Sequence, residues 1–205
     1  MNIKVCGIAD PEFLRRTDEL SIDFAGFIFY PRSQRFIGDR ITADQINAVP
    51  GHMKRVGVFV NEKPEVILSQ AKKYSLDMIQ LHGDEDSMFA EQLAEKIKVI
   101  KAFRVDESFN FSETKPYEKS CSFFLFDTKG KLYGGTGKKF NWDLLQRYTG
   151  HTPFLLSGGI TPEDAGNIRK FSHPALAGVD LNSGFETAAG VKDIQKIKNF
   201  LKHIL

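Results

Sequence analysis

Residues 154–163 read FLLSGGITPE, and these ten residues contain an apolar run, a glycine loop and a helix start. The apolar run is short and does not alternate with polar residues, which is typical of a strand buried on both faces. Thr161 and Pro162 then supply a capping residue and a proline at the first helical position. A strand, a loop and a helix in this order predict one unit of a parallel α/β fold.

The same unit recurs along the chain, because apolar runs alternate with amphipathic stretches from one end to the other. We expect strands near residues 2–6, 23–29, 54–60, 77–81, 97–103, 122–127, 153–157 and 176–180. Eight such units in 205 residues predict an α/β fold with one compact (β/α)8 barrel, the TIM-barrel architecture, over residues 1–205. An open doubly wound sheet is the alternative, but its ligand contacts would gather at one switch point. In this chain, reactive or glycine-rich residues follow several of the apolar runs, which favours the barrel over the open sheet.

The fifth unit departs from the pattern. Residues 104–120 contain Pro116 and several serines and show little helical periodicity. We therefore expect a degenerate fifth helix. In the last unit, Ile194, Ile197, Leu201 and Ile204 recur at helical spacing and predict a closing helix that packs on the sheet.

The composition limits the possible partners. The chain has a formal net charge of +2, with 41% apolar and 26% charged residues, and its basic residues are scattered. These values predict no nucleic-acid and no membrane partner. No apolar stretch approaches the ~20 residues of a membrane span, and the first residues lack a signal-peptide pattern. We expect a cytoplasmic protein, and the oligomeric state stays open with a slight preference for a monomer.

The two cysteines, Cys6 and Cys121, lack metal-type spacing, and we expect neither a metal site nor a disulfide. Cys121 precedes its predicted strand and is interpreted as a packing residue at the opposite end of the barrel from Cys6. Cys6 ends the first run beside Gly7, so it should face the barrel mouth, where a thiol can be a nucleophile or a general base. The alternative for Cys6 is a small buried hydrophobic residue.

Asp127 directly follows the apolar residues 123–126, FFLF. A carboxylate is costly to bury unless it has partners or a raised pKa. We interpret Asp127 as a general acid or base at the end of a barrel strand. A helix cap, or an ion pair with Lys129 or Lys131, is the alternative.

Two late loops predict a phosphate site. Residues 157–159, SGG, follow the seventh run, and residues 182–184, NSG, follow the eighth. Glycine lacks a Cβ atom, so backbone N–H groups can approach an anion, helped by a helix N-terminus. Loops after strands seven and eight commonly bind phosphate in this fold. Two ordinary turns are the alternative.

Arg35 and His82 also follow apolar runs. Arginine offers a planar fork that suits a carboxylate or a phosphate, whereas His82 alone is ambiguous. The acidic residues 84–86 make a metal site beside His82 conceivable, but they better explain the start of the next helix. Residues 134–137, GGTG, could form a lid or a donor loop and lack a nucleotide-binding pattern. The whole set favours proton transfer on a small sugar phosphate without cofactor or metal.

Several short blocks, spread over nearly the whole chain, occur in an order that is specific in combination. They are KVCGI at 4–8, GFIF at 26–29 with Pro31, Ser33 and Arg35, RVGVF at 55–59, QLHG at 80–83, DT at 127–128, GGTG at 134–137, LSGG at 156–159, and Val179 and Asp180 with Ser183 and Gly184. Together they resemble the phosphoribosylanthranilate isomerase family of tryptophan biosynthesis.

The resemblance implies an Amadori rearrangement without a cofactor. N-(5-phosphoribosyl)anthranilate would become 1-(2-carboxyphenylamino)-1-deoxyribulose 5-phosphate. The resemblance implies that Asp127 is the general acid that helps to open the furanose ring, and that Cys6 is the general base that removes the C2 proton. It also implies that Arg35 binds the anthranilate carboxylate.

The remaining matches concern binding. The phosphate loops contribute Gly158, Gly159, Ser183 and Gly184, while His82 and Asp180 are candidates that line the pocket. Asn182 stands where some members of the family have serine, so the detailed phosphate contact stays open.

This mechanism places demands on the pKa values of Asp127 and Cys6, and three other kinds of barrel protein must be weighed against it. We expect a raised pKa for Asp127 and a pKa for Cys6 below the ~8.5 of free cysteine. The histidine-pathway aminoaldose isomerase would have an aspartate at the position of Cys6. Indole-glycerol-phosphate synthase would have a lysine at the end of the first strand, and we expect Lys4 to face the other way. A non-catalytic phosphosugar-binding barrel would not need Cys6 and Asp127 together.

Overall fold

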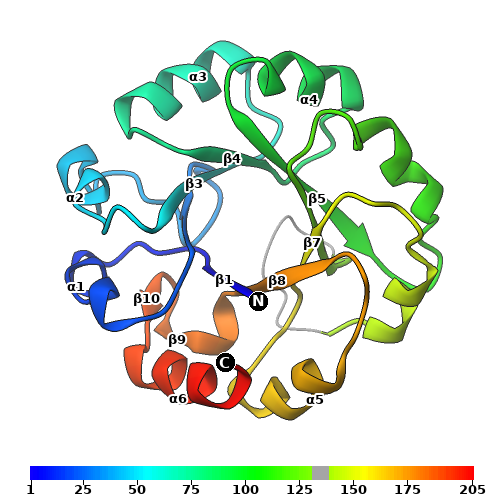
Figure 1. The fold of residues 1–205 in the computed structure, drawn as a ribbon. Helices are drawn as coiled ribbons and strands as arrows, with labels where there is room; N and C mark the ends of the chain where they lie inside the picture. The colour runs from blue at the N-terminus through cyan, green and yellow to red at the C-terminus, as the bar shows by residue number, and fades with distance from the viewer. Residues whose placement is uncertain (131–138) are drawn as a thin grey trace.

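The computed structural model describes residues 1–130 and 139–205 and shows a closed barrel of eight parallel strands surrounded by helices (Figure 1). The strands pair in chain order, and β8 pairs with β1 to close the barrel. The strands are β1 (Asn2–Val5), β2 (Phe24–Ile28), β3 (Lys54–Phe59), β4 (Met78–Leu81), β5 (Lys98–Val105), β6 (Phe123–Thr128), β7 (Phe154–Leu156) and β8 (Leu176–Leu181). The predicted (β/α)8 barrel is confirmed, and each strand overlaps its expected range.

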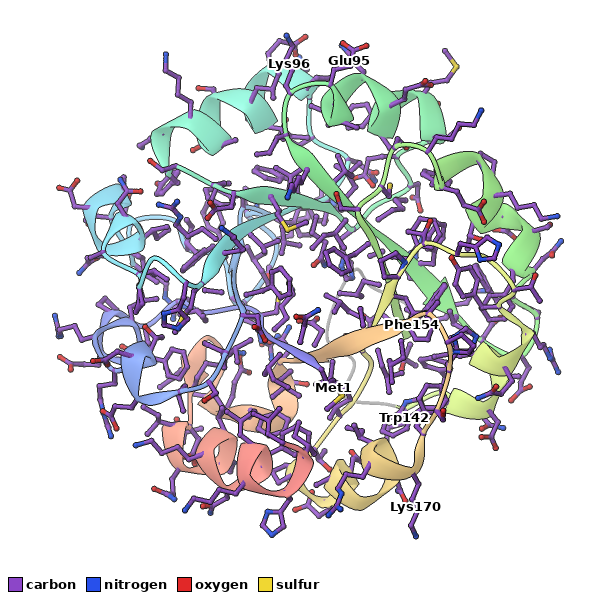
Figure 2. All side chains as sticks on the ribbon, in the orientation of Figure 1. Met1, Glu95, Lys96, Trp142, Phe154 and Lys170 are labelled. Carbon is purple, nitrogen blue, oxygen red and sulfur yellow. The ribbon has the colours of Figure 1, made fainter. Side chains whose placement is uncertain are left out.

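The helical layer is thinner than regular (β/α)8 units would suggest. Its α-helices are α1 (Pro11–Arg15), α2 (Ala43–Asn47), α3 (Pro64–Lys73), α4 (Ser87–Ala94), α5 (Ala165–Lys170) and α6 (Ile194–Ile204). Its 3-10 helices are η1 (Thr17–Glu19), η2 (Phe111–Tyr117), η3 (Trp142–Arg147), η4 (Pro162–Asp164) and η5 (Ser183–Phe185). Figure 2 shows charged side chains such as Lys96 and Lys170 on the outer rim of this layer.

The degenerate fifth helix is confirmed. The connection between β5 and β6 holds only the 3-10 helix η2, which contains Pro116. Proline lacks the N–H that a longer α-helix would need at that position. The connection between β6 and β7 likewise holds only the 3-10 helix η3 in the described residues, and the sequence analysis did not anticipate that irregularity.

Local capping explains where several helices begin. Thr42 accepts a hydrogen bond from the backbone of Gln45, and the Gln45 side chain accepts one from the backbone of Thr42. This capping box satisfies two N–H groups that the first turn of α2 leaves without partners. Asp10 caps α1 in a similar way by accepting from the backbone of Glu12 at 3.0 Å.

The core has two parts, one on each side of the strands. The larger part packs the outward faces of the strands against the helices. The smaller part lies inside the barrel, and we call it the apolar floor; its residues are Phe24, Val56, Met78, Ile100, Ala102, Leu125 and Leu155. Because side chains alternate along a strand, the residue two positions further on also faces the interior. The apolar floor therefore fixes which side chains reach the barrel mouth.

A short hairpin that the sequence analysis did not predict lies between β8 and α6. It consists of β9 (Glu186–Ala188) and β10 (Val191–Lys192), which pair in antiparallel orientation. Gly190 in its turn has a φ of +85°, a left-handed conformation that suits glycine. The hairpin brings Glu186 and Lys192 back toward the barrel mouth. In the part of the chain that the structure describes, no helix is long and apolar enough to cross a membrane.

Candidate active site

A pocket opens at the carboxyl ends of the barrel strands, and we call it the mouth pocket. Seven predicted site residues line it, namely Cys6, His82, Asp127, Gly158, Gly159, Asp180 and Ser183. Gln80, Ser157 and Asn182 also line it, together with apolar side chains that include Ile28 and Val58. Arg35 and Gly184, which were predicted as well, are not among the lining residues.

The mouth pocket continues directly from the apolar floor. Met78 is followed two positions later by Gln80, Leu125 by Asp127, and Leu155 by Ser157. Strands β4, β6 and β7 thus each carry an apolar residue inward at one level and a polar residue inward at the next. The apolar floor lies beneath these polar side chains and excludes water from that side. The exclusion of water strengthens the electrostatic interactions among them.

The two glycine loops pack against each other, as a shared phosphate site requires. Gly158 and Gly159 have φ values of +91° and +64°. A Cβ atom on Gly158 would lie 2.3 Å from the hydroxyl oxygen of Thr128, and one on Gly184 would lie 2.2 Å from the carbonyl oxygen of Ile160. Any larger residue at Gly158 or Gly184 would therefore force the loops after β6, β7 and β8 apart.

Cys6 lies at the end of β1, almost fully buried, with its sulfur packed beside Gly26. A Cβ atom on Gly26 would come within 2.9 Å of that sulfur, so the glycine makes room for it. Burial raises the pKa of Cys6 above its ordinary value, while the charge of Lys4 opposes the rise and the Asp180 carboxylate adds to it. The expectation of a lowered pKa for Cys6 is wrong in this structure, because desolvation outweighs the neighbouring cations.

Lys4 corrects a second expectation. We predicted that Lys4 faces away from Cys6, but residues two apart on a strand share a face. Lys4 is fully buried inside the barrel, and its Nζ lies 2.9 Å from Oδ1 of Asp180. Asp180 Oδ2 also accepts a hydrogen bond from Ser157 at 3.2 Å. Period-two alternation was the signal that should have placed Lys4 inside.

His82 joins β4 to Asp127 across the mouth pocket. Gln80 Nε2 lies 2.7 Å from His82 Nδ1, and His82 Nε2 lies 3.4 Å from Asp127 Oδ2. With the Gln80 amide donating to Nδ1, a neutral imidazole carries its hydrogen on Nε2, the nitrogen that faces Asp127. Among the residues that the structure describes, Gln80 Oε1 and His82 Nε2 are buried atoms without a hydrogen-bond partner. These atoms are available to a ligand.

Asp127 does not pair with Lys129, one of the two lysines in its alternative explanation. Its Oδ1 accepts from the backbone N–H of Thr128 at 2.8 Å, whereas Lys129 pairs with Asp106 at 2.8 Å. Lys131 and the GGTG stretch at 134–137 lie outside the described residues. Asp127 lines the mouth pocket, and its role as a general acid or base stays a prediction.

Arg35 lies beside the pocket in a cluster of partly buried charges. Its guanidinium binds the Glu186 carboxylate through Nε at 2.9 Å and Nη2 at 2.7 Å. Lys192 also contacts Glu186, at 2.7 Å, and donates to the Asn182 side chain at 2.8 Å. Burial lowers the pKa of Lys192 to about 8, although Glu186 attracts its charge. The carboxylate-binding role of Arg35 stays a prediction.

The acidic residues after His82 explain local structure, as expected. Asp86 caps α4 by accepting from the backbone of Phe89 at 2.8 Å. Glu85 is buried and pairs with Lys101 of β5 at 2.9 Å. Over residues 1–130 and 139–205, no group of three or more histidine, cysteine, aspartate or glutamate side chains is placed to hold a metal ion.

Sequence reasoning missed part of the site. Gln80 was visible within the block QLHG but was given no role, although its spacing from His82 places both on one face. Glu186 and Lys192 follow no recognised motif. They reach the mouth only through the β9–β10 hairpin, so no local signal could have identified them.

The barrel and its mouth pocket define an enzyme of the (β/α)8 class, with chemistry at the carboxyl ends of the strands. A family model described as N-(5'phosphoribosyl)anthranilate (PRA) isomerase matches residues 3–203. The N-(5'-phosphoribosyl)anthranilate isomerase of Parabacteroides distasonis is 47% identical over 208 residues, which cover 100% of this chain and 94% of the relative. The protein of that name from Thermotoga maritima is 38% identical, with 99% and 98% covered. The chain therefore belongs to the N-(5'-phosphoribosyl)anthranilate isomerase family.

Solved structures agree with this assignment. Phosphoribosyl anthranilate isomerase from Thermus thermophilus superposes with a TM-score of 0.85 at 27% identity, covering 100% of this chain and 98% of that one. A second phosphoribosyl anthranilate isomerase, in complex with reduced 1-(o-carboxyphenylamino)-1-deoxyribulose 5-phosphate, has a TM-score of 0.80 at 32% identity and the same coverage.

Proposed function

We infer that this chain is the isomerase of tryptophan biosynthesis that converts N-(5'-phosphoribosyl)anthranilate into 1-(2-carboxyphenylamino)-1-deoxyribulose 5-phosphate. One observation carries the inference within the family. A thiol at the end of β1 and a carboxyl at the end of β6 face one pocket, which two packed glycine loops also border. An Amadori rearrangement needs an acid, a base and a hold on the phosphate, and the mouth pocket offers all three.

Asp127 serves as the general acid in the first step. It gives its proton to the furanose ring oxygen while the C1–O bond breaks, and the nitrogen lone pair forms a Schiff base at C1. The carboxylate that remains faces the Nε2 side of His82, 3.4 Å away. A hydrogen on that nitrogen would stabilise the carboxylate, which gives His82 a supporting role.

Cys6 serves as the general base in the second step. Its thiolate removes the proton from C2, the electron pair forms a C1–C2 double bond, and the iminium nitrogen accepts the electrons of the C1–N double bond. The resulting enol amine becomes the ketose when O2 loses a proton and C1 gains one. Because Cys6 is buried, the thiolate depends on the charges around it.

Backbone groups of the two glycine loops bind the phosphate in this proposal. Gly158 and Gly159 adopt left-handed conformations, which can turn their N–H groups toward an anion. Arg35 would bind the anthranilate carboxylate next to Glu186, its present partner. Asn182 lines the pocket and is fixed by Lys192.

Turnover tests the proposal directly. The substrate is generated in situ from anthranilate and phosphoribosyl pyrophosphate by a transferase, and the loss of its fluorescence is followed. We expect turnover by the wild type and a loss of ~100-fold or more in Asp127→Asn, because a positioned proton donor is removed. Asp143→Asn makes the same change at an exposed position outside the pocket and should keep the wild-type rate.

Two results would contradict the proposal. One is a folded wild type that binds phosphosugars without converting the substrate, which would favour a non-catalytic binding barrel. The other is a wild-type rate in Asp127→Asn, which would assign the acid elsewhere. The cytoplasmic location also stays a proposal. So does the monomeric state, since a relative from Thermotoga maritima is described as dimeric.

A further inference from the structure

Lys4 is a fully buried lysine that the proposed mechanism does not use. It lies on β1, two residues before Cys6, and both side chains point into the barrel. Lysine is almost never fully buried unless its charge is paired, because desolvating an ammonium group is costly. A charge kept directly below the reactive thiol therefore needs an explanation.

The strand register holds Lys4 in place. Residues Lys4 and Asp180 are paired across the β1–β8 ladder that closes the barrel, and their side chains form an ion pair of 2.9 Å. Ser157 of β7 donates to the other carboxylate oxygen of Asp180 at 3.2 Å. Lys4 also stands two residues before Cys6, on the same inward face of β1. One lysine thus pairs with a fixed carboxylate and lies next to the thiol along the strand.

The charges around the thiol act in opposite directions. Burial would lower the pKa of Lys4, but Asp180, helped by Cys6, raises it to about 12, so Lys4 stays charged near neutral pH. For Cys6, burial raises the pKa most, Lys4 is the largest influence that lowers it, and Asp180 raises it further. Lys192 of β10 lowers it slightly. Without Lys4, little would offset the burial of the thiolate.

We propose that Lys4 is a positioning residue that stabilises the thiolate of Cys6, and that Asp180 limits this effect by holding the ammonium group. The proposal deepens the proposed function and rests on the role of Cys6 as general base. It predicts that removing the cation and removing its counter-ion change Cys6 in opposite directions. A pair that served only to hold β1 against β8 would not do so.

The test measures the thiol itself. In a Cys121→Ser background, Cys6 is the only cysteine of the chain, and its thiolate is followed by ultraviolet absorbance as the pH is raised. We expect Lys4→Met to move the titration midpoint up by about one pH unit or more, because an adjacent opposite charge is lost. We expect Asp180→Asn to move the midpoint down, because the ammonium group is then no longer shared with a carboxylate.

Two further variants make the test robust. Lys101→Met removes a lysine that is nearly as buried as Lys4 and pairs with Glu85 at the same 2.9 Å, but lies on β5 and not beside Cys6. It should leave the midpoint unchanged. If Lys4→Met fails to fold, the double variant Lys4→Met/Asp180→Asn removes both charges together. Its midpoint should still rise, by less than in the single variant, because Lys4 acts on Cys6 more strongly than Asp180 does.

The outcomes separate this proposal from the proposed function. An unchanged or lowered midpoint in Lys4→Met, or in the double variant if the single one does not fold, would overturn the role of Lys4. A raised midpoint in Lys4→Met together with a raised one in Asp180→Asn would overturn the role of Asp180. The acidic limb of the kcat/KM profile should follow the midpoint in Lys4→Met. A raised midpoint without a shifted limb would support Lys4 and instead contradict Cys6 as the base.

Discussion

The apolar floor and the mouth pocket are built on the same strands but have opposite chemical character. Leu125 and Leu155 are fully buried in the floor, and two residues later Asp127 and Ser157 line the pocket. Since both sets face the barrel interior, strand geometry does not distinguish them. The two sets differ only in their position along the strand. Residues further toward the carboxyl end line the pocket and can take part in chemistry, whereas those before them stabilise the fold.

The same comparison explains how charge is tolerated inside the barrel. Lys4, which is buried inside the barrel and does not line the mouth pocket, is paired with Asp180, which does. Buried ion pairs of this kind add little stability compared with apolar packing. We infer that the charges of the mouth pocket are present for reactivity, whereas the floor and the outer core hold the barrel together.

Leu125→Ala should give the largest loss of stability and would test the role of the floor. It removes a fully buried side chain from the barrel interior, and we expect the free energy of unfolding to fall by about 2–5 kcal/mol. Urea unfolding measures the loss, and turnover per folded molecule should stay close to the wild type. Leu205→Ala, at a position 66% exposed, is the control and should change little. A loss of turnover with unchanged stability would contradict the assignment of stability to the apolar floor and of chemistry to the mouth pocket.

A pH series should show a smaller effect at the amino end of the barrel, where Cys121 precedes β6. Burial raises the pKa of Cys121 from 9.0 to about 11. The folded state therefore binds more protons than the unfolded state between these values, so this stabilisation is full below pH 9.0 and is lost as the pH rises toward 11. The loss amounts to about 1.4 kcal/mol per pH unit at most.

The comparison with Cys121→Ser isolates this contribution. The unfolding free energies of the two proteins are measured between about pH 8 and 10.5, the range in which proton linkage is informative. They should diverge as the pH rises, because the wild type loses stability faster than Cys121→Ser. Parallel curves would contradict the burial effect at Cys121. Turnover at neutral pH should be the same in both proteins, since Cys121 precedes β6, at the opposite end of that strand from Asp127, and does not line the mouth pocket.

Thr42→Ala should have the smallest effect, because it changes neither the apolar floor nor the mouth pocket. It removes the side chain that begins the capping box of α2, and a loss of about 1 kcal/mol in unfolding free energy is expected. Thermal or urea unfolding would detect it, with Thr42→Ser as the matched control that keeps the hydroxyl. A change in kcat for Thr42→Ala would show that the helical layer influences the mouth pocket more than we infer.

The strands and most of the pocket could be predicted from the sequence because each rests on a local pattern. Runs buried on both faces marked all eight strands, and the residues after them marked seven of the pocket positions. Proline and serine between β5 and β6 marked the degenerate fifth helix. These patterns depend on neighbours in the chain, so no knowledge of distant contacts was needed.

The remaining features depend on contacts between distant residues. The sequence shows Lys4 and Asp180 far apart, and only barrel closure makes them partners. The raised pKa of Cys6 follows from its nearly complete burial, which its position at the end of a strand does not reveal in the sequence. The partnership of Arg35 with Glu186 depends on the β9–β10 hairpin. The facing of Lys4, by contrast, was available from strand alternation and was interpreted wrongly.

The most direct test of the central claim, that chemistry belongs to the mouth pocket while the rest of the core holds the fold, is a paired measurement on Cys6→Ser. Its single-turnover rate with the phosphoribosylanthranilate substrate and its unfolding free energy are compared with those of the wild type. We predict a rate at least ~100-fold lower, with an unfolding free energy within about 1 kcal/mol because the change is nearly isosteric. A rate close to the wild type in this folded variant would contradict the claim and remove Cys6 from the reaction.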